Sequence, residues 1–280
     1  MKLDFTENEF KKIRDFIYET SGMYFPDNKK YLIDDRISKR LESLRLDSVD
    51  SYIHYLKFDR NKATELNNLF DAVTINETSF YRNIPQIEAL QKIILPELIE
   101  TKIKSGIKSI KLWSAACSSG EEPYTMSMVL KEILGSSFNS WNIEILATDI
   151  SIAILEQAKR GVYNSNALRN TPPEIVSKYF ISQGRDFVLN NEIKSKVKFI
   201  NLNLMDRMKM RMIRSVDVIF CRNVLIYFDV QSKKQVISSL YSSLSEDGYL
   251  FIGHSESMHG ISSAFKLVHM KNTMVYKKQR

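Results

Sequence analysis

The stretch Ile110-Lys-Leu-Trp-Ser-Ala-Ala-Cys-Ser-Ser-Gly-Glu-Glu-Pro-Tyr124 decides the fold of this chain. Its first residues alternate in strand fashion, and the small residues 114–120 let one backbone segment approach another closely. Glu121 and Glu122 suit the first turn of a helix, where acids complement the helix dipole, and Pro123 suits an early helical position. The stretch therefore predicts a strand, a tight turn and a helix, which form the nucleotide-binding corner of an open α/β sheet.

The two acids at the start of this helix restrict the ligand. Glu121 and Glu122 would repel a phosphate group placed there. They suit a ligand that presents hydroxyl groups, amines or a positive charge. S-adenosylmethionine carries a ribose, an amino acid and a sulfonium, and it has no phosphate. Taken alone, the stretch is also compatible with an ordinary strand–turn–helix of any α/β protein.

The composition is that of a globular protein with one large domain, or with a large and a small one. Of the 280 residues, 44% are hydrophobic and 26% are charged. No apolar run is long enough to cross a membrane, and the first residues lack a signal-peptide core, so we expect no membrane insertion. Cys117 and Cys221 form no disulfide framework, which favours a reducing cytoplasm. The cysteines and histidines lack metal-ligand spacing, so we expect no metal site.

The formal charge of +7 raises the question of a nucleic-acid partner. Acidic and basic residues nearly balance over residues 1–75, and the positive excess lies later in the chain, in scattered side chains. Scattered cations are usually solvated, and here they do not alternate with aromatic residues that would stack on bases. We therefore expect no nucleic-acid partner.

Three segments are predicted: a helical N-terminal domain (1–75), a linker segment that contributes to the ligand site (76–85), and a catalytic domain (86–280). Apolar spacing predicts one N-terminal helix that ends near Ser21, and further helices that span 28–46, 49–57 and 63–73. The second of these helices carries a basic stripe made of Lys29, Arg36, Lys39 and Arg40. Taken alone, such a stripe is better explained as a solvated face.

The catalytic domain shows the strand–helix rhythm of a parallel sheet, interrupted by an inserted β-subdomain at about 162–195. Strands are expected at 110–113, 143–149, 197–202, 216–220 and 249–253, a terminal hairpin at 265–269 and 274–277, and inserted strands at 179–182 and 186–189. Helices are expected at 86–99, from 121, from 151 with Ser151 as the N-cap, and at 231–244, the last closed by Asp247-Gly248.

Two polar features fall where a ligand would lie. The segment Asn76–Arg82 is either a plain linker or a fold over the ligand, and Arg82 is either a ligand residue or a structural ion-pair partner. Asp149 ends the second strand, where an acid accepts hydrogen bonds from ribose hydroxyls. Its distance from the turn is nearer about thirty residues than the roughly twenty of the dinucleotide pattern.

Five motifs, in their order and spacing, carry a resemblance to one family. They are Asn76-Glu-Thr-Ser-Phe-Tyr-Arg82, Ala116-Cys-Ser-Ser-Gly-Glu-Glu-Pro-Tyr124, Thr148-Asp149, Cys221-Arg-Asn-Val-Leu-Ile-Tyr-Phe-Asp229 and Gly253-His-Ser-Glu-Ser257. With them the chain resembles the CheR chemotaxis receptor methyltransferases over nearly its whole length. That family transfers methyl from S-adenosylmethionine to glutamates on the cytoplasmic helices of chemotaxis receptors, giving γ-methyl esters. The resemblance implies a monomeric cytoplasmic enzyme with a Rossmann-like α/β sheet, a small all-helical N-terminal domain and an inserted antiparallel β-subdomain.

The resemblance also implies the residues of the site. S-adenosylmethionine, or its product S-adenosylhomocysteine, would be surrounded by Asn76, Thr78, Arg82, Glu121, Asp149, Asn203, Leu204, Arg222 and Asn223. Of these, Glu121 would face the amino-acid end and Asp149 the ribose. Arg82 and Tyr227 would lie nearest the transferred methyl group. The basic stripe would dock the acidic receptor helices by charge complementarity.

The chemistry of such a transfer needs no general base. A glutamate with a pKa near about 4.3 is already ionised at neutral pH. The work is to desolvate the carboxylate and to align it with the methyl–sulfur bond. A tight bidentate arginine pair would lower the nucleophilicity of the carboxylate. Arg82 and Tyr227 are therefore expected to position the acceptor.

Other functions are also compatible with parts of the sequence. A nicotinamide-dependent oxidoreductase is disfavoured because the turn has the single Gly120 instead of three spaced glycines. A non-catalytic adaptor with the same fold is another alternative, and a different signalling protein is an alternative methyl acceptor. The Ser, His and Glu of Gly253–Ser257 are neighbours in sequence and cannot form a hydrolase relay, so this segment is expected to be the loop after the fifth strand.

Overall fold

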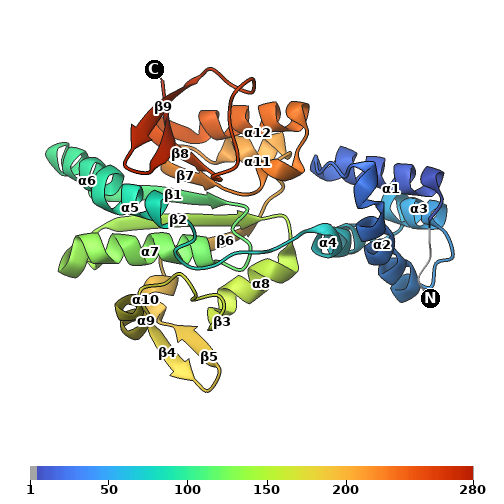
Figure 1. The fold of residues 1–280 in the computed structure, drawn as a ribbon, viewed down its shortest axis with the longest axis horizontal. Helices are drawn as coiled ribbons and strands as arrows, with labels where there is room; N and C mark the ends of the chain where they lie inside the picture. Colours follow the sequence, from blue (N-terminus) through green and yellow to red (C-terminus); the bar gives the residue numbers. More distant parts are fainter. Residues whose placement is uncertain (1–4, 280) are drawn as a thin grey trace.

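The computed structural model of the chain describes residues 5–279 and has two parts (Figure 1). A helical N-terminal domain, drawn in blue, stands beside a larger α/β domain, and the segment after α4 joins them. The α/β domain has a central sheet and a small separate antiparallel sheet, so the predicted fold class is confirmed. No helix within the described residues is long and apolar enough to span a membrane.

Four α-helices form the N-terminal domain, as the apolar spacing predicted. They are α1 (Glu7–Ser21), α2 (Lys30–Leu44), α3 (Val49–Phe58) and α4 (Lys62–Val73), with a 3-10 turn (Asp27–Lys29) before α2. The hydroxyl of Thr6 accepts a hydrogen bond from the N–H of Glu9, and the Glu9 carboxylate accepts one from the N–H of Thr6, which fixes the start of α1. Gly22, with φ 73°, ends this helix.

A seven-stranded sheet forms the centre of the larger domain, in the strand order β6-β2-β1-β7-β8-β10-β9. The strands are β1 (Ser109–Ala115), β2 (Asn142–Asp149), β6 (Val197–Asn201), β7 (Val216–Cys221), β8 (Leu244–Ile252), β9 (Phe265–Met270) and β10 (Thr273–Lys278). Strands β6, β2, β1, β7 and β8 run parallel, and β10 is antiparallel to β8 and β9. The strand order reverses at β1, which places a ligand crevice at the carboxyl ends of β1, β2 and β7.

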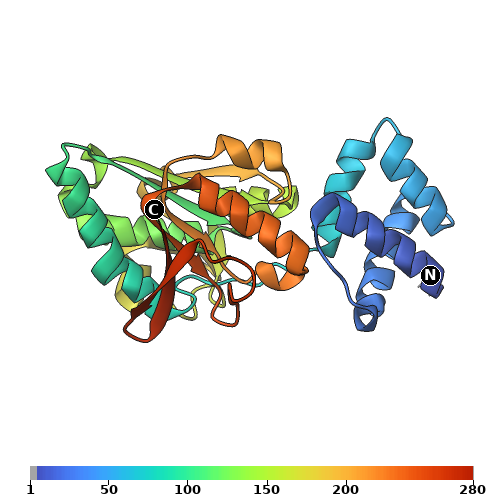
Figure 2. The same ribbon diagram turned by 90° about the horizontal axis from the view of Figure 1, so that it is seen from above.

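Helices cover both faces of this sheet (Figures 1 and 2). On one face lie α5 (Ile84–Ala89), α6 (Leu95–Lys104) and α7 (Glu121–Leu134); on the other lie α11 (Arg207–Met212) and α12 (Val230–Ser243). Helix α8 (Ile152–Arg160) contacts β2, β6 and α4, and its predicted N-cap Ser151 is confirmed. Leu112 and Trp113 of β1 are both fully buried, in different clusters, because a sheet covered on two sides has no solvent-facing side.

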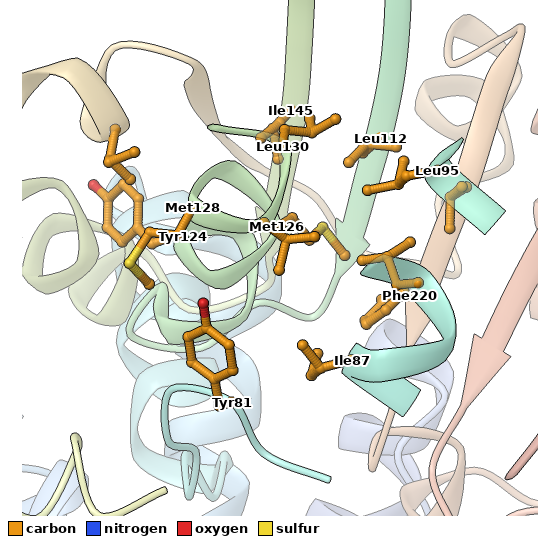
Figure 3. Packing of buried hydrophobic residues seen from close by; sticks show 14 of the residues in the cluster. Tyr81, Ile87, Leu95, Leu112, Tyr124, Met126, Met128, Leu130, Ile145 and Phe220 are labelled. Carbon is orange, nitrogen blue, oxygen red and sulfur yellow. The ribbon is translucent and has the colours of Figure 1, made fainter. Parts of the chain in front are cut away.

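The linker segment is packed into the core. Phe80 is fully buried and makes edge contacts with the rings of Tyr163 and Phe180 in the inserted subdomain. Figure 3 shows Tyr81 and Ile87 pointing towards the buried side chains of α7. The two predicted alternatives were a plain linker and a fold over the ligand. The segment has the second form, a fixed wall over the ligand crevice.

The inserted subdomain contains the predicted hairpin and more. Its elements are β3 (Val162–Asn164), α9 (Pro173–Tyr179), β4 (Phe180–Gln183), β5 (Asp186–Leu189) and α10 (Asn191–Lys194). The strands form a small antiparallel sheet in the order β3-β5-β4. Strand β3 and the two short helices were not predicted.

Two predicted elements differ in the structure. The helix expected at 86–99 is α5, a π-helical turn (Leu90–Ile94) and α6. Helix α12 ends at Ser243, so Asp247-Gly248 does not close it but lies within β8. A register shift after Val216 accommodates these two residues as a bulge, and a Cβ on the glycine would lie only 3.1 Å from the Val216 carbonyl oxygen.

Candidate active site

A cavity lies at the carboxyl ends of β1, β2 and β7, where the strand order places a ligand crevice. It encloses about 1070 Å³ of empty space, with the solvent at its mouth included. The linker segment and residues of the N-terminal domain line its other sides. The predicted site residues that line it are Asn76, Thr78, Arg82, Asp149, Asn203, Leu204, Arg222, Asn223 and Tyr227. One cavity therefore brings together every residue predicted for the cofactor and the methyl group except Glu121.

The turn after β1 shapes one wall of the cavity. Ala116 and Ser118 have φ values of 66° and 49°, which are strained for residues other than glycine. Gly120, with φ 93°, precedes α7, and a Cβ there would lie 2.9 Å from the Cβ of Ala158. The small residues therefore keep the backbone of the turn open to the cavity and close to α8.

Asp149 holds the end of β2 against this turn. One carboxylate oxygen accepts a hydrogen bond from the N–H of Ser118 (2.9 Å), and the other accepts one from the N–H of Ser151 (3.0 Å). Burial raises the pKa of the Asp149 carboxyl, and these N–H groups oppose the rise. A buried carboxylate that lines the cavity suits hydroxyl donors such as those of a ribose.

The acid of the α7 start that faces the cavity is Glu122 and not Glu121. Glu122 lines the cavity, accepts a hydrogen bond from the Ser114 hydroxyl (2.7 Å) and pairs with Arg222 (3.1 Å). Glu121 accepts one from the Ser119 hydroxyl (2.7 Å) and lines a shallower neighbouring pocket. Successive helical residues point about 100° apart, so only Glu122 lines this cavity, and the place of Glu121 at the amino-acid end of the cofactor stays a prediction. Burial raises the pKa of both carboxyls.

Arg222 braces the interior of the cavity and keeps one donor unused. Its Nη2 donates to the carbonyl oxygen of Arg82 (2.7 Å), while its buried Nε has no partner among the described residues. An unpaired buried donor suits an acceptor on a bound molecule. Together with the buried acids Glu122 and Asp149, it fits a ligand that carries a positive charge, hydroxyl groups and a carboxylate, as S-adenosylmethionine does.

Tyr227 and two arginines lie together on the side of the cavity towards the N-terminal domain. Burial raises the pKa of the Tyr227 hydroxyl, and the positive charges of Arg82 and Arg36 oppose the rise. Arg82 donates to the carbonyl oxygen of Glu77 in the linker (2.8 Å), and Arg36 donates to the carbonyl oxygen of Val73 at the end of α4 (2.6 Å). Two cations therefore lie beside Tyr227, while at the strand tips Glu122 pairs with Arg222 and Asp149 ends β2.

The N-terminal domain contributes residues that sequence reasoning missed. Ser21 and Met23 line the cavity, and the backbone of Met23 bridges to Phe228. The side-chain amide of Asn203 donates to the carbonyl oxygen of Thr20 (2.7 Å), so this predicted cofactor residue also holds the two domains together. No local spacing in the sequence signals these contacts, because their partners lie far apart along the chain.

The basic stripe is not a row of free cations. Arg40 forms a two-pronged ion pair with the buried Glu65, at 2.9 and 2.6 Å. Arg36 binds the end of α4, as described above. Lys29 and Lys39 are exposed, and Lys39 pairs with Asp35 of its own helix. The ion pair gives Arg40 a structural role, and its part in docking, like that of the rest of the stripe, stays a prediction.

Comparison with known proteins identifies the family. The sequence model of the CheR methyltransferase SAM-binding domain matches residues 76–274, and that of the CheR methyltransferase all-alpha domain matches residues 8–74. Chemotaxis protein methyltransferase 2 of Vibrio cholerae is 36% identical, over 98% of this chain and 93% of that protein. The chemotaxis protein methyltransferase of Borreliella burgdorferi is also 36% identical, over 93% and 92%. Chemotaxis protein methyltransferase 1 of Pseudomonas aeruginosa is 33% identical, over 96% and 97%. The chain therefore belongs to the CheR family of chemotaxis protein methyltransferases, whose catalytic domain binds S-adenosylmethionine.

Proposed function

We propose that this protein transfers methyl groups from S-adenosylmethionine to glutamate side chains on the cytoplasmic helices of chemotaxis receptors. The observation that carries the proposal is the pair of cations beside Tyr227. Glu122 and Asp149 suit the cationic, hydroxyl-bearing cofactor, and Arg82 and Arg36 lie beside Tyr227. A cationic end beside the transferred group suits an anionic acceptor, and a glutamate side chain is one.

The residues of this chain position the acceptor rather than activate it. The cofactor supplies an electrophilic methyl group on a sulfonium, and a glutamate carboxylate is ionised at neutral pH without a base. Arg82 attracts the carboxylate, and the Tyr227 hydroxyl donates one hydrogen bond that fixes its angle. Arg82 also donates to Glu77, which limits how tightly it can pair with the acceptor and so preserves the nucleophilicity of the carboxylate.

The direct test uses labelled S-adenosylmethionine and membranes that contain chemotaxis receptors. We expect label on the receptors that is released as methanol by mild alkali, as a γ-methyl ester is. Alkali-stable label would point to another side chain. Label on a soluble protein, with none on the receptors, would replace the receptor as the acceptor.

Docking on acidic receptor helices predicts a salt-dependent reaction. Lys29→Glu with Lys39→Glu should raise the KM for receptor several-fold and leave kcat unchanged, because both side chains are exposed and outside the cavity. The wild-type rate should fall steeply with added salt. The control is Lys104→Glu with Lys108→Glu, which makes the same charge change between the end of α6 and the start of β1, at the opposite end of the strand from the cavity. Equal KM values for all three proteins would leave the two lysines as solvated side chains.

Cofactor binding should depend on pH through the buried acids. Because burial raises the pKa of Glu122 and Asp149, each is partly protonated in the free protein at pH values above its ordinary range. A cationic ligand favours their ionised forms, so binding should release protons, and affinity should fall as the pH is lowered towards the raised pKa values of these carboxyls. Calorimetry in buffers with different ionisation enthalpies measures the release. Glu122→Gln should flatten the pH dependence, and pH-independent binding by the wild type would contradict the argument.

A further inference from the structure

The loop after β8 carries a carboxylate with no role in the cavity lining. This loop is the segment Gly253-His-Ser-Glu-Ser257, and most of its side chains are exposed. Its backbone turns back on itself, since the N–H of Glu256 donates to the carbonyl oxygen of Gly253 (2.9 Å). The turn points the half-buried side chain of Glu256 towards the neighbouring loop, which follows β7.

Glu256 collects three backbone donors from two loops. One carboxylate oxygen accepts from the N–H groups of Asn223 (3.0 Å) and Gly253 (2.5 Å), and the other accepts from the N–H of Ile226 (3.2 Å). Hydrogen bonds to an ionised acceptor are stronger than those between neutral groups. The carboxylate therefore ties the loop after β7 to the loop after β8 at the end where both parallel strands stop.

The loop after β7 is the one that needs such a tie. Asn223 has φ 58°, in the left-handed region, and its side chain lines the cavity. A 3-10 turn (Leu225–Tyr227) follows, and it carries Tyr227 into the same cavity. Strain at Asn223 persists only where surrounding contacts fix the backbone. The bonds of Glu256 to Asn223 and Ile226 supply that fixation from the catalytic domain.

Gly253 permits the contact. A Cβ at this position would lie 2.6 Å from a carboxylate oxygen of Glu256 and 2.9 Å from the nitrogen of Asn223. Neither the carboxylate nor the backbone nitrogen can remain in place at such distances. The glycine and the glutamate of the motif thus act as one unit.

We propose that Glu256 is a positioning residue for methyl transfer. It acts through Asn223 and Tyr227 by holding the backbone of the loop that carries them. The proposal rests on the place of Tyr227 at the transferred methyl group in the function proposed above. Misplacement by about 1 Å can cost a reaction about a hundredfold in rate. Loss of this clamp should therefore lower kcat while the protein stays folded.

The experiment compares Glu256→Ala, Glu256→Gln and Gly253→Ala with the wild type, at a temperature well below every melting temperature. We expect kcat to fall at least about tenfold in Glu256→Ala and Gly253→Ala, and less in Glu256→Gln, which keeps one acceptor oxygen. Amide hydrogen exchange of Asn223 and Ile226 should accelerate in all three. His254→Ala, which changes an exposed neighbour in the same loop, is the matched control and should retain full kcat.

A double-mutant cycle separates positioning from a general structural role. If Glu256 acts through Tyr227, then Glu256→Ala combined with Tyr227→Phe should lose little more kcat than the worse single variant. Additive losses, or an unchanged kcat in folded Glu256→Gln, would overturn the proposal. If the wild type methylates no receptor glutamate, the function proposed above fails instead; the hydrogen-exchange result and the affinity for adenosylhomocysteine still report whether the clamp holds the loop.

Discussion

Tyr227→Phe should lower kcat for methyl transfer by about ten- to a hundredfold and leave the affinity for adenosylhomocysteine nearly unchanged. Within residues 5–279 the Tyr227 hydroxyl has no hydrogen-bond partner, so its removal breaks no bond of the folded protein. Its ring packs against the core of the N-terminal domain, and phenylalanine keeps that packing. A hydrogen bond to a charged acceptor is worth about 1.5–3 kcal/mol, and each 1.4 kcal/mol or so is tenfold in rate.

The companion variant Arg82→Ala tests the charge at the same end of the cavity. We expect a larger loss than for the tyrosine, with a raised KM for receptor, because the variant removes the cation that attracts the acceptor. Arg82→Lys retains the charge but not the forked geometry, so its loss of kcat should lie between those of Tyr227→Phe and Arg82→Ala. Initial rates with labelled cofactor give kcat and KM, and calorimetry with adenosylhomocysteine gives the affinity. Near-normal transfer by Tyr227→Phe and Arg82→Ala would remove both residues from the site.

Much of this cavity could be predicted because its parts are local in sequence. The turn 114–120 is recognisable from its small residues, and Asp149 from its place at the end of a buried strand. In an open parallel sheet such strand ends converge, whatever the rest of the fold. No knowledge of long-range contacts is therefore needed to predict that these groups meet at one crevice.

The choice between Glu121 and Glu122 required more than the sequence pattern. Both acids suit the first helical turn, and the dipole argument does not distinguish them. The direction of each side chain depends on the backbone of Gly120, whose φ of 93° sets where the helix begins to turn. A rotation of about 100° per residue then decides which carboxylate meets Arg222 and which meets Ser119.

Elements with few buried residues were also missed. Helix α11 has a single buried residue, Met210, and its other side chains are exposed. Its sequence, Arg207-Met-Lys-Met-Arg-Met212, therefore appeared as scattered charge. The helix is set by Asp206, whose carboxylate accepts from two N–H groups of its first turn, and by packing on α12. Tertiary contacts, more than helical periodicity, specify this element.

The Arg40–Glu65 ion pair could not be predicted for a related reason, and it leads to a large expected effect on stability. Glu65 is 2% exposed and lies in α4, two helices after the α2 helix of Arg40, so no spacing within α2 could predict the pair. Its carboxylate accepts from Arg40, from the Tyr52 hydroxyl (2.7 Å) and from the side-chain amide of Asn68 (3.0 Å). Burial alone would raise the pKa of Glu65, but these donors outweigh it and hold the pKa below its usual value.

Glu65→Ala should therefore destabilise the N-terminal domain by about 3–5 kcal/mol, since it leaves the Arg40 guanidinium partly buried and unpaired. The lowered pKa of Glu65 also means that its ionised form stabilises the folded state. This stabilisation is complete above the ordinary pKa of a glutamate, and it is lost as the pH falls through the lower pKa of the folded state. Urea unfolding should be followed by far-ultraviolet circular dichroism, because both tryptophans, Trp113 and Trp141, lie in the catalytic domain.

The control is Asp50→Ala, which breaks an exposed ion pair with Lys12 in the same domain and should cost less than about 1 kcal/mol. Equal losses in the two variants would mean that the Arg40–Glu65 pair adds nothing beyond a surface bridge. A second consequence follows from Ser21 and Met23, which line the cavity from this domain. Where the N-terminal domain of Glu65→Ala unfolds first, affinity for adenosylhomocysteine should fall with it, although Glu65 does not line the cavity.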